Sequence, residues 1–288
     1  MLISKVKLYS NELAKTKDFY VTLLGFNLLD ETEDSFVIEA GKSELEFQQS
    51  NLNDHPSYHF AFDIPSNQFK AAKEWAKAKV VLNREDGDDE VYFENLDAYS
   101  LYFEDPSKNI VELIARKSSP TVEGYFSSQS ILKISEMSIT TNDVLSVGQQ
   151  LMEFGIPVKD DLPLKEQFNF MGRESSFLIL VSENRRWFFS DRDSEIHPSV
   201  IELDKRKVIE VDRQGKVKLL GGDSKSKYMS IFFLTLLASI SSFFLMAFVF
   251  DGGVYVETAI YIFGAIIVIL LSYLISLMYY AIDLIKSK

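Results

Sequence analysis

The chain has 288 residues, no cysteine and a formal net charge of −12. This length allows two domains, or one domain with an appendage. The lack of cysteine excludes disulfides, thiolate nucleophiles and cysteine-ligated zinc or iron–sulfur sites. Because the chain is acidic and has no long basic block, nucleic acid is not expected as a partner.

The N-terminal residues predict a strand, a helix and three more strands. Residues 3–10 alternate polar and apolar side chains as a strand does, and residues 11–25 carry apolar residues at helical spacing up to Gly25. The following strands are predicted at 26–31, 35–41 and 44–49.

The same order of elements recurs twice along the chain. A strand at 57–64 and a helix at 66–78 precede three strands within 90–116. A strand at 131–139 and a helix at 143–155 precede looser strands that end near residue 203. Helices followed by antiparallel strands indicate an α+β fold, here built from repeated βαβββ modules, two well matched and the third looser.

Polar residues occupy matching positions in the repeats. One polar residue in each repeat lies seven positions before the start of the predicted helix: Lys5, His59 and Glu136. Between apolar neighbours in a last strand lie Glu46, Glu112 and Glu202. An isolated glutamate in a strand either faces solvent or needs a partner inside the protein. Three such residues at one repeat position favour a shared inward direction.

Other residues that could carry chemistry have weaker contexts. The aromatic run Trp187, Phe188 and Phe189 follows Arg185 and Arg186 and either lines a pocket or packs in the core. We expect the core, as large aromatic side chains usually pack there. His55 and His197 each precede a proline, and we expect them in a loop and a turn.

The C-terminal residues differ from the rest in composition. The runs 228–250 and 258–282 contain no charged residue, and a membrane-spanning helix needs about 20 apolar residues. They predict a transmembrane helical hairpin over 228–282 that follows a basic stalk at 205–227. Basic residues flank the hairpin and the connecting loop is acidic, so we expect a multi-pass cell-membrane protein with both chain ends in the cytoplasm.

Three segments resemble the vicinal oxygen chelate superfamily, which includes glyoxalase I, extradiol dioxygenases and the fosfomycin and bleomycin resistance proteins. They are KVKLYSNELAKTKDFYVTLLGF, YHFAFDIP and EDPSKNIVELIAR. The resemblance covers residues 1–117 well and a third, divergent module at 131–204 loosely, with a linker at 118–130. It implies that the two modules of 1–117 pair and that their mixed sheets curl around a metal.

The resemblance also implies where ligands lie. The glyoxalase-type pattern falls on Lys5, Glu46, His59 and Glu112, and the dioxygenase pattern on Lys5, His59 and Glu112. The family has histidine where this chain has Lys5, and a protonated lysine only donates hydrogen bonds. We therefore expect His59, Glu46 and Glu112 to bind Mn, Fe, Ni or Zn, with Glu46 and Glu112 as catalytic candidates and Lys5 holding an anionic substrate.

Three functions stay open at this point. The first is a metalloenzyme that polarises neighbouring oxygens of a small substrate. The second is a metal-free binding protein, in which His59 is a satisfied polar residue and Lys5 pairs with Glu46 or Glu112. The third is a role in assembly, since modules work in pairs and the third module could pair with its copy in a symmetric homodimer.

Overall fold

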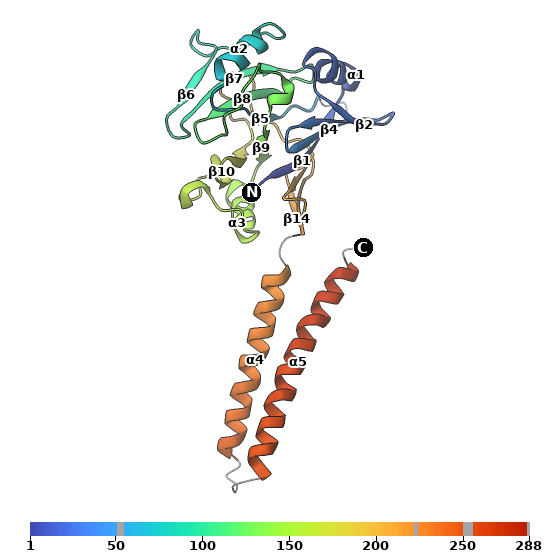
Figure 1. Ribbon diagram of the computed structural model, residues 1–288, viewed down its shortest axis with the longest axis vertical. Coiled ribbons are helices and arrows are strands. Elements are labelled where there is room, and N and C mark those ends of the chain that lie inside the picture. Colours follow the sequence, from blue (N-terminus) through green and yellow to red (C-terminus); the bar gives the residue numbers. More distant parts are fainter. Residues whose placement is uncertain (51–54, 222–223, 250–255, 287–288) are drawn as a thin grey trace. The chain divides into compact units, whose positions relative to one another are not determined.

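The computed structural model describes residues 1–50, 55–221, 224–249 and 256–286. The chain divides into two compact units, residues 1–220 and residues 221–288. Figure 1 shows the first unit as a set of twisted strands with short helices around them, and the second as two long helices.

The first repeat forms the predicted order of elements. It contains β1 (Ile3–Ser10), α1 (Leu13–Lys17), the π-helical segment η1 (Asp18–Leu23), β2 (Leu28–Glu31), β3 (Ser35–Ala40) and β4 (Ser43–Gln49). The helical stretch ends where predicted, because Gly25 has φ of +81°, a left-handed conformation that glycine adopts without strain.

The second and third repeats follow the same order. The second contains β5 (His59–Asp63), α2 (Phe69–Lys77), β6 (Val91–Phe93), β7 (Ala98–Glu104) and β8 (Ile110–Arg116). The third contains β9 (Lys133–Thr141), α3 (Val144–Glu153), β10 (Phe168–Arg173), β11 (Ser176–Ser182) and β12 (Ser199–Leu203). The short 3-10 helices η2 (Ser128–Ser130) and η3 (Lys159–Asp161) lie in connections, and β13 (Lys207–Val211) and β14 (Val217–Gly221) end the unit.

The strands form two seven-stranded sheets, which we call the β1 sheet and the β5 sheet. The β1 sheet has the order β14-β13-β12-β1-β4-β3-β2, and the β5 sheet has the order β10-β11-β9-β5-β8-β7-β6. Both sheets contain parallel and antiparallel strand pairs. In the β1 sheet, for example, β1 and β4 are parallel, and in the β5 sheet β5 and β9 are antiparallel. The predicted α+β class with mixed sheets is therefore confirmed.

The pairing of modules differs from the expectation for residues 1–117. The first module pairs with β12, whereas the second pairs with the third through β5 and β9. The first two modules thus lie in different sheets. The third module therefore pairs with the second module of the same chain. The homodimer was expected because the third module needed a partner, so this argument no longer holds, and no finding supports the dimer.

An apolar core lies between the sheets and fixes which side chains face away from it. Phe60 and Phe62 of β5 and Val111 and Leu113 of β8 belong to one buried cluster with residues of the β1 sheet, such as Val6. Successive side chains of a strand point to opposite faces. The other residues of these strands, among them His59 and Glu112, therefore point to the outer face of the β5 sheet.

The C-terminal unit consists of α4 (Ser224–Val249) and α5 (Val256–Lys286), drawn in orange and red in Figure 1. Among the residues described, no helix is both long enough and apolar enough to pass through a membrane. The predicted transmembrane hairpin therefore has no support from the structure. Residues 250–255, in the predicted connecting loop, lie outside the described residues.

Candidate functional site

Three buried metal-donor side chains meet on the outer face of the β5 sheet. They come from three adjacent strands: His59 from β5, Glu112 from β8 and Glu136 from β9. Ala61 of β5 is the register partner of both glutamates. One ligand atom from each residue lies within 4.8 Å of the others. The repeat positions and the strand order together place these donors side by side.

His59 is held in the tautomer that a metal ligand needs. Its Nδ1 lies 3.0 Å from the carbonyl oxygen of Ile110, and a carbonyl only accepts, so Nδ1 carries the proton and donates it. Nε2 then has a free lone pair and lies 3.5 Å from Oε2 of Glu112. Burial lowers the pKa of His59 to about 4, so the ring is neutral near neutral pH.

Glu112 is the carboxyl group most inclined to hold a proton. Burial, together with the nearby Glu136, raises its pKa well above the ordinary value, and Ser100, Arg116 and Tyr102 offset only part of this rise. Ionising both of two carboxyl groups that share a buried site costs free energy, because the two negative charges repel each other. A cation bound there would displace the proton from Glu112.

Arg116 of β8 neutralises the other acids of the cluster. Its Nη2 donates a hydrogen bond to Oε1 of Glu136, and its Nη1 donates to Oδ1 of Asp63 at 3.2 Å and to Oγ of Ser135 at 3.0 Å. All three charged groups are buried. Burial raises the pKa of Glu136, and Arg116 offsets part of this rise and fixes the orientation of the carboxyl group.

The cluster opens into a cavity of about 260 Å³. Its walls are mostly aromatic: Phe93, Tyr102, Phe168, Phe170, Trp187 and Phe188. Arg185, Asn95, Leu96 and Ile179 complete the lining. A concave, largely apolar site with a few convergent polar groups is the usual form of a small-molecule site, and this volume suits a small ligand.

The segment 183–198 forms one wall of this cavity. It is held in place by hydrogen bonds to residues 83 and 85, which precede the strands β6–β8. Arg186 pairs with Glu85 through both carboxylate oxygens, and Glu85 Oε2 also accepts the backbone N–H of Phe189 at 3.1 Å. Asn83 donates to the Phe189 carbonyl at 2.8 Å. These contacts hold Trp187 over the cluster, with its ring centroid 5.0 Å from that of His59.

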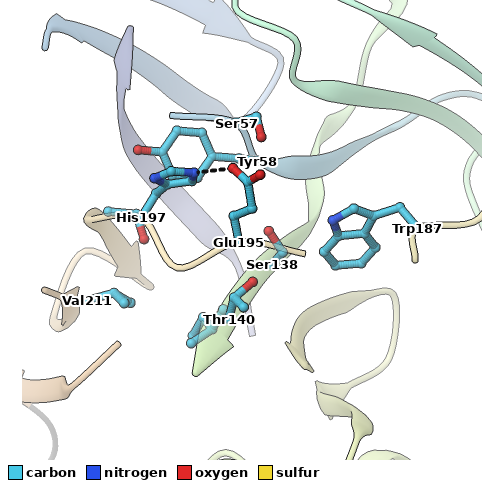
Figure 2. Close-up of a pocket in the computed structure, with 10 residues that line it drawn as sticks. Ser57, Tyr58, Ser138, Thr140, Trp187, Glu195, His197 and Val211 are labelled. Carbon is cyan, nitrogen blue, oxygen red and sulfur yellow. Dashed lines mark hydrogen bonds and ion pairs between the residues drawn. The ribbon is translucent and has the colours of Figure 1, made fainter. Parts of the chain in front are cut away.

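Two other cavities are poorer candidates. Figure 2 shows a polar pocket in which His197 pairs with Glu195 beside Tyr58, with Trp187 on its far side. Its volume of about 10 Å³ holds one water at most. His197, expected in a turn, is buried there, with Nε2 2.9 Å from Oε2 of Glu195. A wider groove of about 610 Å³ on the β1 sheet is lined by no histidine.

The structure brings two of the expected ligands together and separates the others. His59 and Glu112 meet, but Glu46 and Lys5 lie in the β1 sheet. Glu46 pairs with Lys5 at 2.8 Å and with Lys7 at 3.1 Å, and neither Glu46 nor Lys5 lines the cavity described above. The expected grouping of Glu46 with His59 is therefore not the one that the fold forms.

Sequence reasoning left out part of this site. Glu136 has the same repeat position as His59, which was the available signal, but the assumed pairing of the first two modules pointed to Glu46 instead. Arg116, the last residue of β8, is not among the predicted site residues. Trp187, expected in the core, is buried in a side cluster and also lines the cavity.

Two family models match parts of the chain. The model described as Glyoxalase/Bleomycin resistance protein/Dioxygenase superfamily matches residues 2–113. This match supports that superfamily for the N-terminal part. The model described as Toxoflavin-degrading enzyme matches residues 134–185. His59 and Glu112 fall within the first match and Glu136 within the second. A search of the curated proteins finds no match.

Several solved structures are similar to the chain in fold. Lactoylglutathione lyase from Agrobacterium tumefaciens is 19% identical, with 39% of this chain and 91% of that chain covered and a TM-score of 0.33. The fosfomycin resistance protein FosX from Listeria monocytogenes, solved with Mn(II) and 1S,2S-dihydroxypropylphosphonic acid, is 20% identical, with 41% and 91% covered and a TM-score of 0.33. A putative dioxygenase from Bacillus subtilis is 10% identical, with 77% and 85% covered and a TM-score of 0.47.

Proposed function

We propose that this protein is a divalent-metal-dependent enzyme that acts on a small substrate with two neighbouring oxygens, as a lyase, isomerase or dioxygenase. The observation that carries the proposal is the meeting of His59, Glu112 and Glu136 within 4.8 Å at an aromatic-lined cavity. One imidazole and two carboxylates suit Mn²⁺, Fe²⁺, Ni²⁺ or Zn²⁺.

The residues of the cluster have separate tasks in this proposal. His59 offers Nε2 because Ile110 fixes its other nitrogen, and Glu136 offers a carboxylate that Arg116 orients. A bound cation would supply Lewis-acid polarisation of the substrate oxygens. Glu112 holds a proton at its raised pKa while the site has no cation, and it would release this proton to become the third ligand.

The cavity walls would position the substrate and exclude water. Trp187 and Tyr102 flank His59, with ring centroids 5.0 Å and 6.2 Å from that of the imidazole. Removing water strengthens every electrostatic interaction between the cluster and a bound substrate. The same walls limit access to small, flat molecules.

Metal content of the full-length protein, measured by elemental mass spectrometry after purification without chelator, tests the proposal. We expect about one Mn, Fe, Ni or Zn per chain, lost in His59→Ala and retained in His55→Ala. His55 is the matched control because it is exposed. A wild-type protein that takes up none of these metals, even when they are added, would overturn the proposal.

One observation favours a second candidate, a metal-free binding protein. Arg116 already neutralises Glu136 inside the cluster, as Lys5 neutralises Glu46 in the other sheet. An internal arginine can thus take the place of an external cation. Ligand binding by the wild-type protein without metal, unchanged by added metal, would favour this candidate over the enzyme.

Membrane attachment is a separate proposal that rests on the uncharged runs of the sequence alone. It places the protein at the cell membrane with both chain ends in the cytoplasm. Extraction of the membrane fraction with alkaline carbonate tests it: recovery of the protein in the supernatant would exclude an integral attachment.

A further inference from the structure

We infer that the cavity takes an aromatic substrate that carries an anionic group, and that Arg185 is the residue that recognises this anion. The inference rests on the proposed function for the identity of the cavity as the substrate site. It adds the chemical class of the substrate and a specificity-determining residue outside the metal-donor cluster.

Among the described residues Arg185 forms no ion pair, whereas the adjacent Arg186 pairs with Glu85. Arg185 is also the only arginine in the described lining of the cavity. Within the part of the chain that the structure describes, the guanidinium of Arg185 donates one long hydrogen bond, 3.5 Å from Nη1 to the carbonyl oxygen of Arg186. In a chain of net charge −12, an arginine without a carboxylate is a site at which a ligand anion can bind.

The side chain of Arg185 is already fixed at the cavity wall. Its guanidinium carbon lies 4.4 Å from the ring centroid of Phe168, and both residues line the cavity. Stacking on an aromatic face orients the planar guanidinium and leaves its N–H donors at the edge. Arg185 is half-buried at this wall, and the burial lowers the pKa of its guanidinium. A desolvated donor fork binds a carboxylate or phosphonate more strongly than an exposed one does.

The remaining lining explains the aromatic part of the substrate. Aromatic rings make up most of the lining that Arg185 shares with the buried cluster, and stacked or edge-to-face contacts favour a flat ligand. Arg185 is the only lysine or arginine among the described residues that line the cavity, so the anionic group should lie toward it. The neighbouring oxygens of the substrate would then face His59.

Calorimetric binding of 3,4-dihydroxybenzoate and of its neutral amide, 3,4-dihydroxybenzamide, to the full-length protein tests the inference. We expect the carboxylate to bind at least about tenfold more tightly than the amide, as a charge-assisted hydrogen-bond pair provides. Arg185→Gln should remove this preference and Arg185→Lys should keep part of it. Arg173→Gln is the matched control, since Arg173 is exposed and pairs with Asp161 outside the cavity.

The outcomes separate this inference from the proposed function. The carboxylate preference could disappear in Arg185→Gln while the wild-type protein takes up no metal. This result would support the inference and contradict the proposed metalloenzyme. Stoichiometric metal with equal binding of the two probes overturns the inference and leaves the metalloenzyme standing. Failure of both probes to bind, or an undiminished preference in a folded Arg185→Gln, also overturns the inference. Thermal unfolding of each variant verifies that it is folded.

Discussion

The two sheets place polar residues at the same repeat positions and use them differently. In the β1 sheet Lys7 is the register partner of Glu46, and in the β5 sheet Ala61 is the register partner of Glu112. Two residues earlier stand Lys5 and His59. In the β1 sheet the lysines neutralise Glu46 within the sheet. In the β5 sheet a neutral imidazole and an alanine leave Glu112 without a cation of its own.

The difference shows that exposure and local charge decide what a repeat position can do. The side chains of Lys5 and Lys7 are each 28% exposed, whereas those of His59 and Glu112 are 6% and 3% exposed. In the β5 sheet Trp187 covers the position, and burial lowers the pKa of His59 and raises that of Glu112. Such perturbed groups at a cavity are typical of functional sites, whereas partly exposed ion pairs are typical of surfaces.

The largest expected effect comes from removing the internal cation of the β5 sheet. Arg116→Met leaves Asp63 and Glu136 buried without their partner, and we expect the free energy of unfolding to fall by about 3–5 kcal/mol. Urea unfolding at neutral pH measures it. The adjacent Lys117→Met is the control: Lys117 is exposed, so its loss should change stability by no more than about 0.5 kcal/mol. Equal losses in both variants would mean that Arg116 does not hold the carboxylates.

Exchanging His59 and Lys5, the residues that differ between the two sheets at one repeat position, tests the comparison directly. His59→Lys puts a protonated amine, which only donates, at the candidate ligand position, and we expect metal affinity to fall at least about 100-fold. Competition with a chromogenic chelator measures this. The reverse exchange, Lys5→His, should not create a site, because Lys7 still pairs with Glu46. Metal binding by the β1 sheet of Lys5→His would show that the lysine alone separates the sheets.

A carboxyl group at the junction of the sheets should make stability depend on pH. Asp105, after β7, accepts hydrogen bonds from Tyr20 of η1 and from Asn109, and burial raises its pKa from 3.8 to about 6. The folded state therefore binds more protons than the unfolded state between these values. The free energy of unfolding should fall by about 3 kcal/mol as pH rises through this window.

Denaturant unfolding of wild type and Asp105→Asn between pH 4 and pH 7 isolates this contribution. The variant should be less stable at low pH, because it loses acceptor capacity for Tyr20 and Asn109, and the gap should narrow as pH rises. A gap that is constant over the window would show that Asp105 ionises in the folded state as easily as in the unfolded one.

The sequence predicts local structure here better than it predicts which modules meet. Strand alternation and helix spacing are local, so β1 falls on the predicted residues and α2 within the predicted range. The grouping of His59 with Glu136 depends on β5 pairing with β9, a contact between distant residues that no periodicity reveals. Glu46 was expected at the site because the first two modules were assumed to pair. The uncharged C-terminal runs predicted membrane spans, for which the described residues give no support.

The smallest effect on stability is expected from Glu46, the glutamate of the β1 sheet that pairs with two lysines. Burial alone would raise the pKa of Glu46, but Lys5 and Lys7 lower it below the ordinary 4.5. The ion pairs therefore stabilise the fold above this pH, and the contribution is lost as pH falls through the lowered pKa. Because the side chains are partly exposed, Glu46→Gln should cost only about 0.5–1 kcal/mol, and less at high salt.

Metal content distinguishes the two glutamates more clearly than stability does. Glu46→Gln should leave metal uptake unchanged, because Lys5 and Lys7 occupy its carboxylate, whereas Glu112→Gln should reduce uptake sharply. Elemental mass spectrometry of both variants, prepared in parallel with wild type, provides the comparison. Reduced metal in Glu46→Gln with unchanged metal in Glu112→Gln would transfer the candidate site to the β1 sheet. It would also mean that the lysines of that sheet exchange their partner for a metal ion.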